Sequence, residues 1–210
     1  MKSYDVYYVK LDDLAELERR AGGERQLRLT FSRADKVPGS EWLACNYRDG
    51  ASPPADEILS GEASLAGPRS AKFGEVIYIF ANMPDSLVYE HALDGKMLRK
   101  LVWFPLLGPD TADVDDDWTP GWLCAEGEPE PWEASIFFRP ERLAEAIEWE
   151  RENYADRGKS DRFSEREAAI RKMWDDRIIA ASDILPSCDG TVAFAIEKHF
   201  GIPSPAKQQR

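Results

Sequence analysis

The dipeptide Asp94-Gly95 separates two apolar stretches rich in strand-forming residues, at residues 87–93 and 96–104. A two-residue connection of this composition suits a type I′ turn, because both central residues of that turn need a positive φ. The spacing therefore predicts a β-hairpin over residues 87–104. We place the rest of the chain around this hairpin.

The two-residue turn also predicts which residues of the hairpin lie opposite one another. Pairs of opposite charge and pairs of aliphatic side chains both stabilise neighbouring strands, and both kinds occur in the register that the turn implies. Counting outward from the turn, the predicted pairs are Leu93/Lys96, Ala92/Met97, His91/Leu98, Glu90/Arg99, Tyr89/Lys100, Val88/Leu101 and Leu87/Val102.

Several other stretches have strand patterns. Residues 75–81 are apolar on both faces, which indicates a central strand that is covered on both sides. Residues 26–32 alternate large apolar and polar side chains, which is typical of a strand with one face in solvent. Residues 4–11, 42–47 and 122–126 are the remaining candidate strands, and residues 48–72 are predicted to be loop with one helical turn near 56–59.

Helical signals lie mostly beyond residue 130. Before it, Asp12 or Asp13 can cap a short helix that Gly22-Gly23 ends. Pro140 suits the first position of a long helix. Ser164 begins a capping box for a second helix, and Asp189 caps a third, which Gly201 ends.

Strands followed by helices are typical of the α+β class. We expect an antiparallel sheet, arranged as a meander around the hairpin at 87–104, with the C-terminal helices packed against it. A chain of 210 residues suits a single domain. Within it we expect a sheet-forming part at 1–130, a helical part at 131–202 and a polar tail at 203–210.

The charge balance restricts the class of partner. Asp and Glu outnumber Lys and Arg by 39 to 27, so the formal net charge is −12. This disfavours nucleic acid, whose phosphates need clustered Lys and Arg, and it also disfavours an anionic membrane surface. No apolar run is long enough for a membrane helix, and the first residues lack the pattern of a signal peptide. The three widely spaced cysteines are typical of free thiols, so we expect a cytoplasmic protein; its oligomeric state stays open.

An acidic run follows the hairpin. It consists of Asp113, Asp115, Asp116 and Asp117 and precedes Trp118. The alternate spacing resembles the first ligands of a helix–loop–helix Ca²⁺ site, but Trp118 and Cys124 occupy the positions where that site needs Gly and Glu. We therefore expect no metal and no cofactor, with a weak Ca²⁺ site at 113–117 as an open alternative. The run is then either a solvated loop or a surface that attracts a basic partner.

The next stretch offers an alternative function. Glu126, Glu128, Glu130 and Glu133 lie on a segment broken by prolines. Two carboxyl groups placed across a cleft could hydrolyse a glycosidic bond, so a carboxylate-based hydrolase with its site near 113–133 is the alternative. The same segment could instead be a rigid loop that anchors Trp132 in the core.

Two further arrangements are weaker candidates. Cys124 and His91 could form a nucleophile and base on neighbouring strands, but acidic surroundings would raise the pKa of the thiol. Tryptophans are concentrated around the acidic run, where they could line a binding groove or fill the core. They are Trp103, Trp118, Trp122 and Trp132.

Three segments in the second half of the chain are distinctive. Tyr89-Glu-His-Ala-Leu-Asp-Gly-Lys-Met-Leu-Arg-Lys-Leu is followed at residue 122 by Trp-Leu-Cys-Ala-Glu-Gly-Glu-Pro-Glu-Pro-Trp-Glu, and residues 195–203 read Ala-Ile-Glu-Lys-His-Phe-Gly-Ile-Pro. These segments resemble an uncharacterised family of bacterial cytoplasmic proteins. The resemblance implies a bacterial, cytosolic origin and assigns no catalytic residue. The acidic insertion at 110–118 departs from the family pattern.

The sequence contains none of the common catalytic or nucleotide-binding signatures. We therefore expect a non-catalytic protein-binding or regulatory module, of the immunity-protein type, that meets a basic protein through an acidic, tryptophan-rich surface. The candidate binding residues are Asp113, Asp115, Asp116, Asp117, Trp118, Trp122, Glu126 and Glu128.

Overall fold

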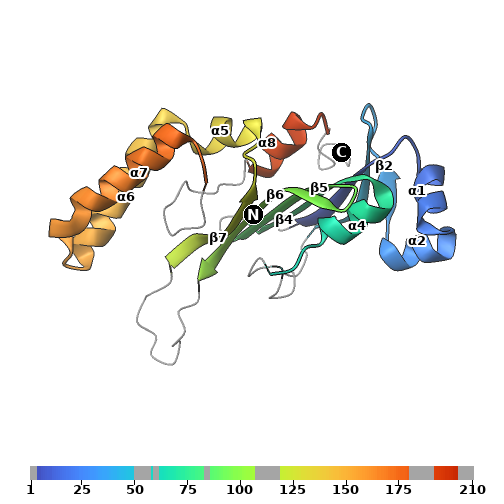
Figure 1. Ribbon diagram of the computed structural model, residues 1–210, viewed down its shortest axis with the longest axis horizontal. Coiled ribbons are helices and arrows are strands. Elements are labelled where there is room, and N and C mark those ends of the chain that lie inside the picture. Colours follow the sequence, from blue (N-terminus) through green and yellow to red (C-terminus); the bar gives the residue numbers. More distant parts are fainter. Residues whose placement is uncertain are drawn as a thin grey trace, which may run out of the picture.

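A seven-stranded antiparallel sheet runs through the molecule and carries helices on both faces (Figure 1). The computed structural model describes residues 4–49, 58, 62–82, 86–106, 119–179 and 192–202. The strands lie in the order β2-β3-β1-β4-β5-β6-β7. Their bounds are β1 Tyr4–Lys10, β2 Ala34–Lys36, β3 Trp42–Asp49, β4 Glu75–Asn82, β5 Ser86–Leu93, β6 Lys96–Leu106 and β7 Thr119–Gly127. The predicted α+β class is confirmed.

The helices divide between the two faces of the sheet. One face packs against α1 (Leu14–Ala21), α2 (Glu24–Thr30) and α4 (Ala66–Phe73). On the other face lie α5 (Pro131–Phe137) and α8 (Val192–His199), and the same core continues into α6 (Pro140–Asp156) and α7 (Phe163–Asp176).

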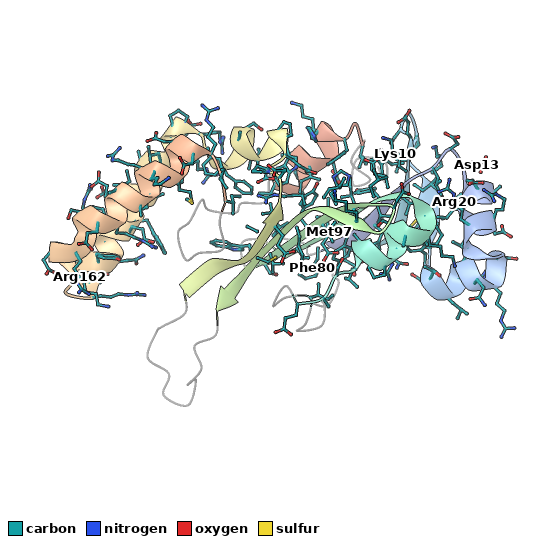
Figure 2. All side chains as sticks on the ribbon, in the orientation of Figure 1. Lys10, Asp13, Arg20, Phe80, Met97 and Arg162 are labelled. Atoms are coloured by element: carbon teal, nitrogen blue, oxygen red, sulfur yellow. The ribbon has the colours of Figure 1, made fainter. Side chains whose placement is uncertain are left out.

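The sheet has one hydrophobic core on each face. Successive strand residues pack alternately into the two cores, because side chains alternate along a strand. Tyr7 belongs to the core beneath α1, α2 and α4, whereas Tyr8 belongs to the core beneath α5 and α8. Phe80 and Met97 lie on the α4 side of the sheet (Figure 2). Residues 76–81 of β4 are buried on both faces, as the sequence predicted.

The helices α6 and α7 form a hairpin that extends sideways from the sheet (Figure 1). A short 3₁₀ turn, Ser160–Arg162, joins the two helices at the far end, where Figure 2 labels Arg162. Glu150 and Arg166 pair across the hairpin at 2.8 Å. This turn also explains why the Ser164 capping box was wrong. The backbone N–H of Phe163 donates to the carbonyl of Ser160, and α7 begins at Phe163 with Arg162 as its N-cap, two residues before the predicted position and without a side-chain cap.

The turn of the central hairpin and the first two predicted pairs, Leu93/Lys96 and Ala92/Met97, are confirmed, but the register predicted from His91 onward is wrong. Asp94 and Gly95 have φ values of 49° and 84°, and Leu93 lies opposite Lys96. A bulge between His91 and Ala92 then shifts the pairing by one residue. The observed pairs are Ala92/Met97, His91/Arg99, Glu90/Lys100, Tyr89/Leu101, Val88/Val102 and Leu87/Trp103.

The bulge decides which face of the sheet receives each charge, because one extra residue exchanges the two faces of a strand. Arg99 lies on the α5 side beside His91, and Lys100 lies on the α4 side beside Glu90. Glu90 and Lys100 are 3.8 Å apart and almost fully buried.

Two other sequence predictions are corrected. Residues 26–32 were expected to form a strand, but α2 spans Glu24–Thr30. The alternating leucines do not form a buried strand face, since Leu29 is 74% exposed, and Arg28 pairs with Glu24 one helical turn away. The loop expected at 48–72 begins later and ends earlier, because β3 continues to Asp49 and α4 begins at Ala66. The N-cap expected at Asp189 for the last helix lies outside the described residues, as does most of the helical turn expected at 56–59.

Candidate functional site

The predicted binding residues fall into two groups. Asp113, Asp115, Asp116, Asp117 and Trp118 lie outside the described residues. Trp122 lies in β7, with its backbone opposite Trp103 of β6. Glu126 and Glu128 are exposed at the end of β7.

The acidic run connects the two strands of the hairpin β6–β7. The residues that bound the connecting segment, Leu106 and Thr119, lie opposite one another in the register. In the part of the chain that the structure describes, β7 is the outermost strand of the sheet and pairs with β6 alone. The segment that contains the acidic run therefore starts at Leu106 and ends at Thr119, which are opposite residues of the edge hairpin of the described sheet.

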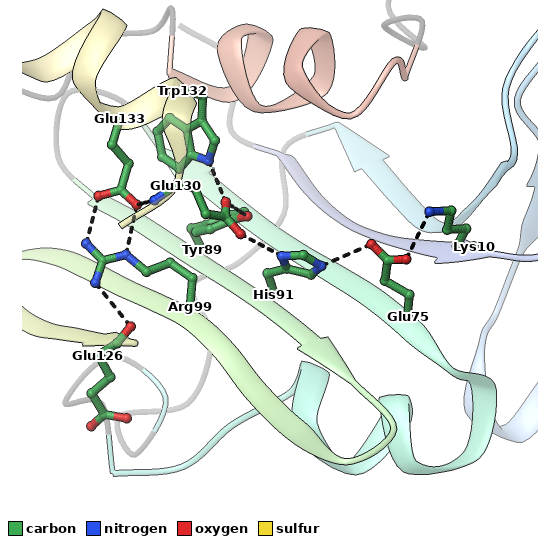
Figure 3. A network of polar contacts seen from close by, with 9 residues as sticks. All are labelled: Lys10, Glu75, Tyr89, His91, Arg99, Glu126, Glu130, Trp132 and Glu133. Atoms are coloured by element: carbon green, nitrogen blue, oxygen red, sulfur yellow. Dashed lines mark hydrogen bonds and ion pairs between the residues drawn. The ribbon is translucent and has the colours of Figure 1, made fainter. Parts of the chain in front are cut away.

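A cluster of buried polar side chains lies where the chain passes from β7 to α5 (Figure 3). Glu130 is the N-cap of α5 and forms a reciprocal capping box with Glu133. The carboxylate of Glu130 accepts hydrogen bonds from the Trp132 indole at 2.6 Å and from the Tyr89 hydroxyl. It also contacts His91 Nδ1 at 2.6 Å.

Glu133 makes the second buried contact of this cluster. Both of its oxygens accept hydrogen bonds from the Arg99 guanidinium, at 2.8 and 2.7 Å, and both side chains are only 1% exposed. Nη1 of Arg99 also donates to the carbonyls of Glu126 and Gly127, at 3.2 and 2.9 Å. One guanidinium thus attaches the end of β7 and the first turn of α5 to β6.

A row of charges leads from this cluster to the surface. Nε2 of His91 lies 3.2 Å from a carboxylate oxygen of Glu75, and the other oxygen of Glu75 pairs with Lys10 at 3.0 Å. The exposed fraction of the side chains rises outward, from 9% for His91 to 21% for Glu75 and 40% for Lys10. The row crosses β5, β4 and β1.

The two carboxylates determine the protonation of His91. Burial alone would lower the pKa of His91, but its hydrogen bonds with Glu130 and Glu75 outweigh burial and raise this pKa to about 9. Burial would likewise raise the pKa of Glu130, but hydrogen bonds from His91, Tyr89 and Trp132 lower it. The hydrogen bond with His91 is also the main cause that lowers the pKa of Glu75. At neutral pH the row is therefore an imidazolium between two carboxylates.

These geometries restrict the chemistry that the cluster can perform. Both ring nitrogens of His91 are bonded to carboxylates, so the imidazolium has no lone pair with which to accept a proton. A general acid at Glu130 would need a raised pKa, and the pKa of this carboxyl is lowered. Glu133 is held by both arms of Arg99. The carboxylates at 130 and 133 therefore serve the attachment of α5, and Trp132 is buried there at 3% exposed, as the loop interpretation predicted.

Cys124 and His91 do not form a catalytic pair. Cys124 belongs to the core on the α4 side of the sheet, whereas His91 contacts Glu130 and Phe200 on the opposite side. Burial raises the pKa of the Cys124 thiol to about 11, and the charge of Glu126 acts in the same direction. The thiol is therefore protonated at neutral pH and a poor nucleophile.

A second buried carboxylate on the α4 side has a structural role. Glu90 is fully buried, and its Oε2 accepts hydrogen bonds from the Ser64 hydroxyl and from the backbone N–H groups of Leu65 and Ala66. A carboxylate at this place satisfies the free N–H groups at the start of α4 and complements the helix dipole. The sequence could not supply this contact, because 24 residues separate Glu90 from Ala66.

The sequence contained one signal of the α5 cluster. Glu130-Pro131-Trp132-Glu133 has the capping-box spacing, with Pro at the first helical position.

Among the described residues, no group of three or more His, Cys, Asp and Glu side chains is placed to hold a metal ion. No helix within the same ranges is long and apolar enough to cross a membrane.

Comparisons of this chain with protein-family models, with curated proteins and with solved structures find no match. The resemblance to a bacterial cytoplasmic family stays a prediction. The function has to be inferred from the residues of the chain itself.

Proposed function

We propose that this protein is a non-catalytic binding module that binds a basic protein partner. The binding surface is the edge of the sheet that the hairpin β6–β7 forms. The observation that carries the proposal is the pairing of Leu106 with Thr119, which makes the acidic run the connection of the outermost described hairpin. A net charge of −12 favours a partner of opposite sign and accelerates their encounter.

The exposed charges beside the hairpin support the same partner. Glu126 and Glu128 are exposed at the far end of β7, where the strand leaves the sheet for α5, so they add negative charge to the same edge strand at the end opposite to Thr119. The backbone beneath them is fixed, because Arg99 holds the carbonyls of Glu126 and Gly127. A fixed scaffold reduces the entropy that binding costs.

The edge of β7 favours contact through side chains over pairing of an added strand. Pro120 lacks a backbone donor, and the register shifts between Trp122 and Cys124. A proline and a bulge both hinder main-chain pairing at a sheet edge. We therefore expect recognition to depend on charge and on ionic strength.

The test compares affinity captures from a bacterial lysate by three forms of the protein: wild type, a quadruple Asp→Asn variant at 113, 115, 116 and 117, and a matched control. The control carries the same change of charge on the helical hairpin: Glu152→Gln, Asp161→Asn, Glu165→Gln and Asp175→Asn. We expect a basic protein to be retained by the wild type and the control, to be lost from the quadruple variant, and to be released by salt. All three forms should melt at similar temperatures. Equal retention by the two variants would overturn the proposal.

A further inference from the structure

The cluster around His91 contains three pairs of opposite charge, and Lys10 at its outer end also lies 4.0 Å from the exposed Glu41. Lys10 pairs with Glu75 and Arg99 pairs with Glu133, so each of these carboxylates has its own cation. The remaining pair is His91 with Glu130. Two neutral side chains also lie beside His91: Tyr89 on β5 shares Glu130 with it, and Phe200 after α8 lies edge-on to its ring at 5.0 Å. The helix α8 carries a buried carboxylate, Glu197, which accepts a hydrogen bond from the Tyr8 hydroxyl on β1. His199, the second histidine of the chain, is exposed on α8.

We propose that His91 is a pH-sensitive clasp that holds the start of α5 on the sheet while the ring is protonated and releases it when the ring loses its proton. A neutral imidazole carries one N–H, so it can donate to Glu130 or to Glu75 but not to both. The other ring nitrogen then presents a lone pair to a carboxylate, which repels it.

The loss of one proton affects Glu130 most. Glu75 keeps Lys10, and Glu133 keeps Arg99, whereas Glu130 keeps only neutral donors from Tyr89 and Trp132. A largely buried carboxylate without a counter-charge is unfavourable, and hydration relieves it. Because Glu130 is the N-cap of α5, its hydration opens the first turn of that helix.

The geometry also limits how far the opening extends. Arg99 and Glu133 do not depend on His91, so they keep the second half of the capping box attached to β6. On the opposite face, α4 is held by Glu90. The clasp therefore predicts local opening at residues 130–133 and no change at α4.

Two measurements on the wild-type protein test the clasp. The first is an NMR titration of the imidazole carbons, with His199→Gln to assign the two signals. The second is hydrogen exchange, in which the protection factors of the backbone N–H groups of Trp132 and Glu133, in the first turn of α5, and those of α4 are compared between about pH 7 and about pH 10 after correction for intrinsic rates. We expect protection of α5 alone to fall, with the same midpoint as the titration of His91, near the raised value that its two carboxylates give it.

The variant Glu130→Gln separates the clasp from general alkaline unfolding. It removes the charge that becomes uncompensated but keeps an oxygen for Tyr89 and Trp132, so the protection of α5 should no longer depend on pH. Three results would each overturn the proposal. They are a His91 titration near that of a free imidazole, simultaneous loss of protection in α4 and α5, and the same pH profile in Glu130→Gln as in the wild type.

Discussion

Arg99 and Glu133 form a two-armed ion pair in which both side chains are 1% exposed, although 34 residues separate them in the chain. The pair joins β6 to the first turn of α5, and Arg99 also binds two carbonyls at the end of β7. The direction in which the chain leaves the sheet therefore depends on a single guanidinium. Because the pair is buried, a substitution that removes one partner leaves the other as a buried, uncompensated charge, which strongly destabilises the folded protein.

Arg99→Met should be strongly destabilising. It leaves Glu133 buried without its cation and frees the carbonyls of Glu126 and Gly127, so we expect a loss of about 3–5 kcal/mol in the free energy of unfolding. Urea denaturation measures it. The double variant Arg99→Met/Glu133→Leu should recover part of the loss, since it removes the uncompensated charge as well.

An exposed pair provides the control for this prediction. Arg171 and Glu167 lie one turn apart on α7, and the Arg171 side chain is 54% exposed. Arg171→Met should cost at most about 0.5 kcal/mol, because water screens the pair. Similar losses at Arg99 and Arg171 would show that burial does not decide the strength of these pairs.

The free energy of unfolding should fall as the pH rises through about 9, the pKa of His91 in the folded protein. The folded pKa lies above the ordinary value of 6.5, so the folded state binds the proton more tightly than the unfolded state. The contribution is complete below about pH 6.5 and is lost as the pH passes 9. Its size is on the order of 3 kcal/mol, from about 1.4 kcal/mol for each unit of pKa.

Urea denaturation at a series of pH values checks this contribution. The difference in stability between wild type and His91→Gln should be largest near pH 6 and should shrink toward pH 10. His199→Gln, which changes the exposed histidine of α8, should follow the wild type throughout. A constant difference between wild type and His91→Gln across this range would contradict the prediction.

The turn of the central hairpin could be predicted from sequence, but its register could not. Asp94-Gly95 determines a local conformation, and local sequence is enough to identify it. The bulge at His91 depends on distant partners: it brings Arg99 to the side where Glu133 lies and Lys100 to the side where Glu90 lies. The sequence pattern alone offered Glu90/Arg99 as a plausible pair, and no local signal opposed it.

The candidate site shows the same limit. Glu126 and Glu128 are exposed, but a charged side chain is usually solvated wherever it lies, so their place on a binding surface stays a prediction. The burial of the neighbouring Glu130 and Glu133 could not be predicted from the sequence. Glu130 and Glu133 are drawn inward by His91 and Arg99, which come from strands 39 and 34 residues earlier.

Cys45 and Cys124 should be inert toward thiol reagents in the folded protein. Both are buried, and burial is the main cause that raises the pKa of each thiol. Alkylation with iodoacetamide near pH 8, followed by mass mapping of each site, should therefore modify them only after urea is added. Rapid modification of Cys124 in the native protein would contradict this prediction and would indicate a reactive thiol at this position.

Gly127→Ala should be among the most destabilising substitutions of a glycine in this chain. Gly127 has a φ of 82°, and an added Cβ would lie 1.9 Å from the carbonyl oxygen of Leu98, where backbone atoms cannot yield easily. Leu98 is the extra residue of the bulge, so the substitution forces apart the strands whose contact positions Arg99. We expect a loss of at least about 3 kcal/mol, because the steric conflict adds to the strain of a positive φ.

Gly158→Ala is the matched control, because Gly158 has a φ of 65° and no atom within 4 Å of an added Cβ. It should lose only the cost of the left-handed conformation, about 1 kcal/mol. Urea denaturation of the two variants isolates the close approach of β7 to β6 from backbone strain. Equal losses would mean that β7 can move away from Leu98 at no cost, and Arg99 would then not fix the end of that strand.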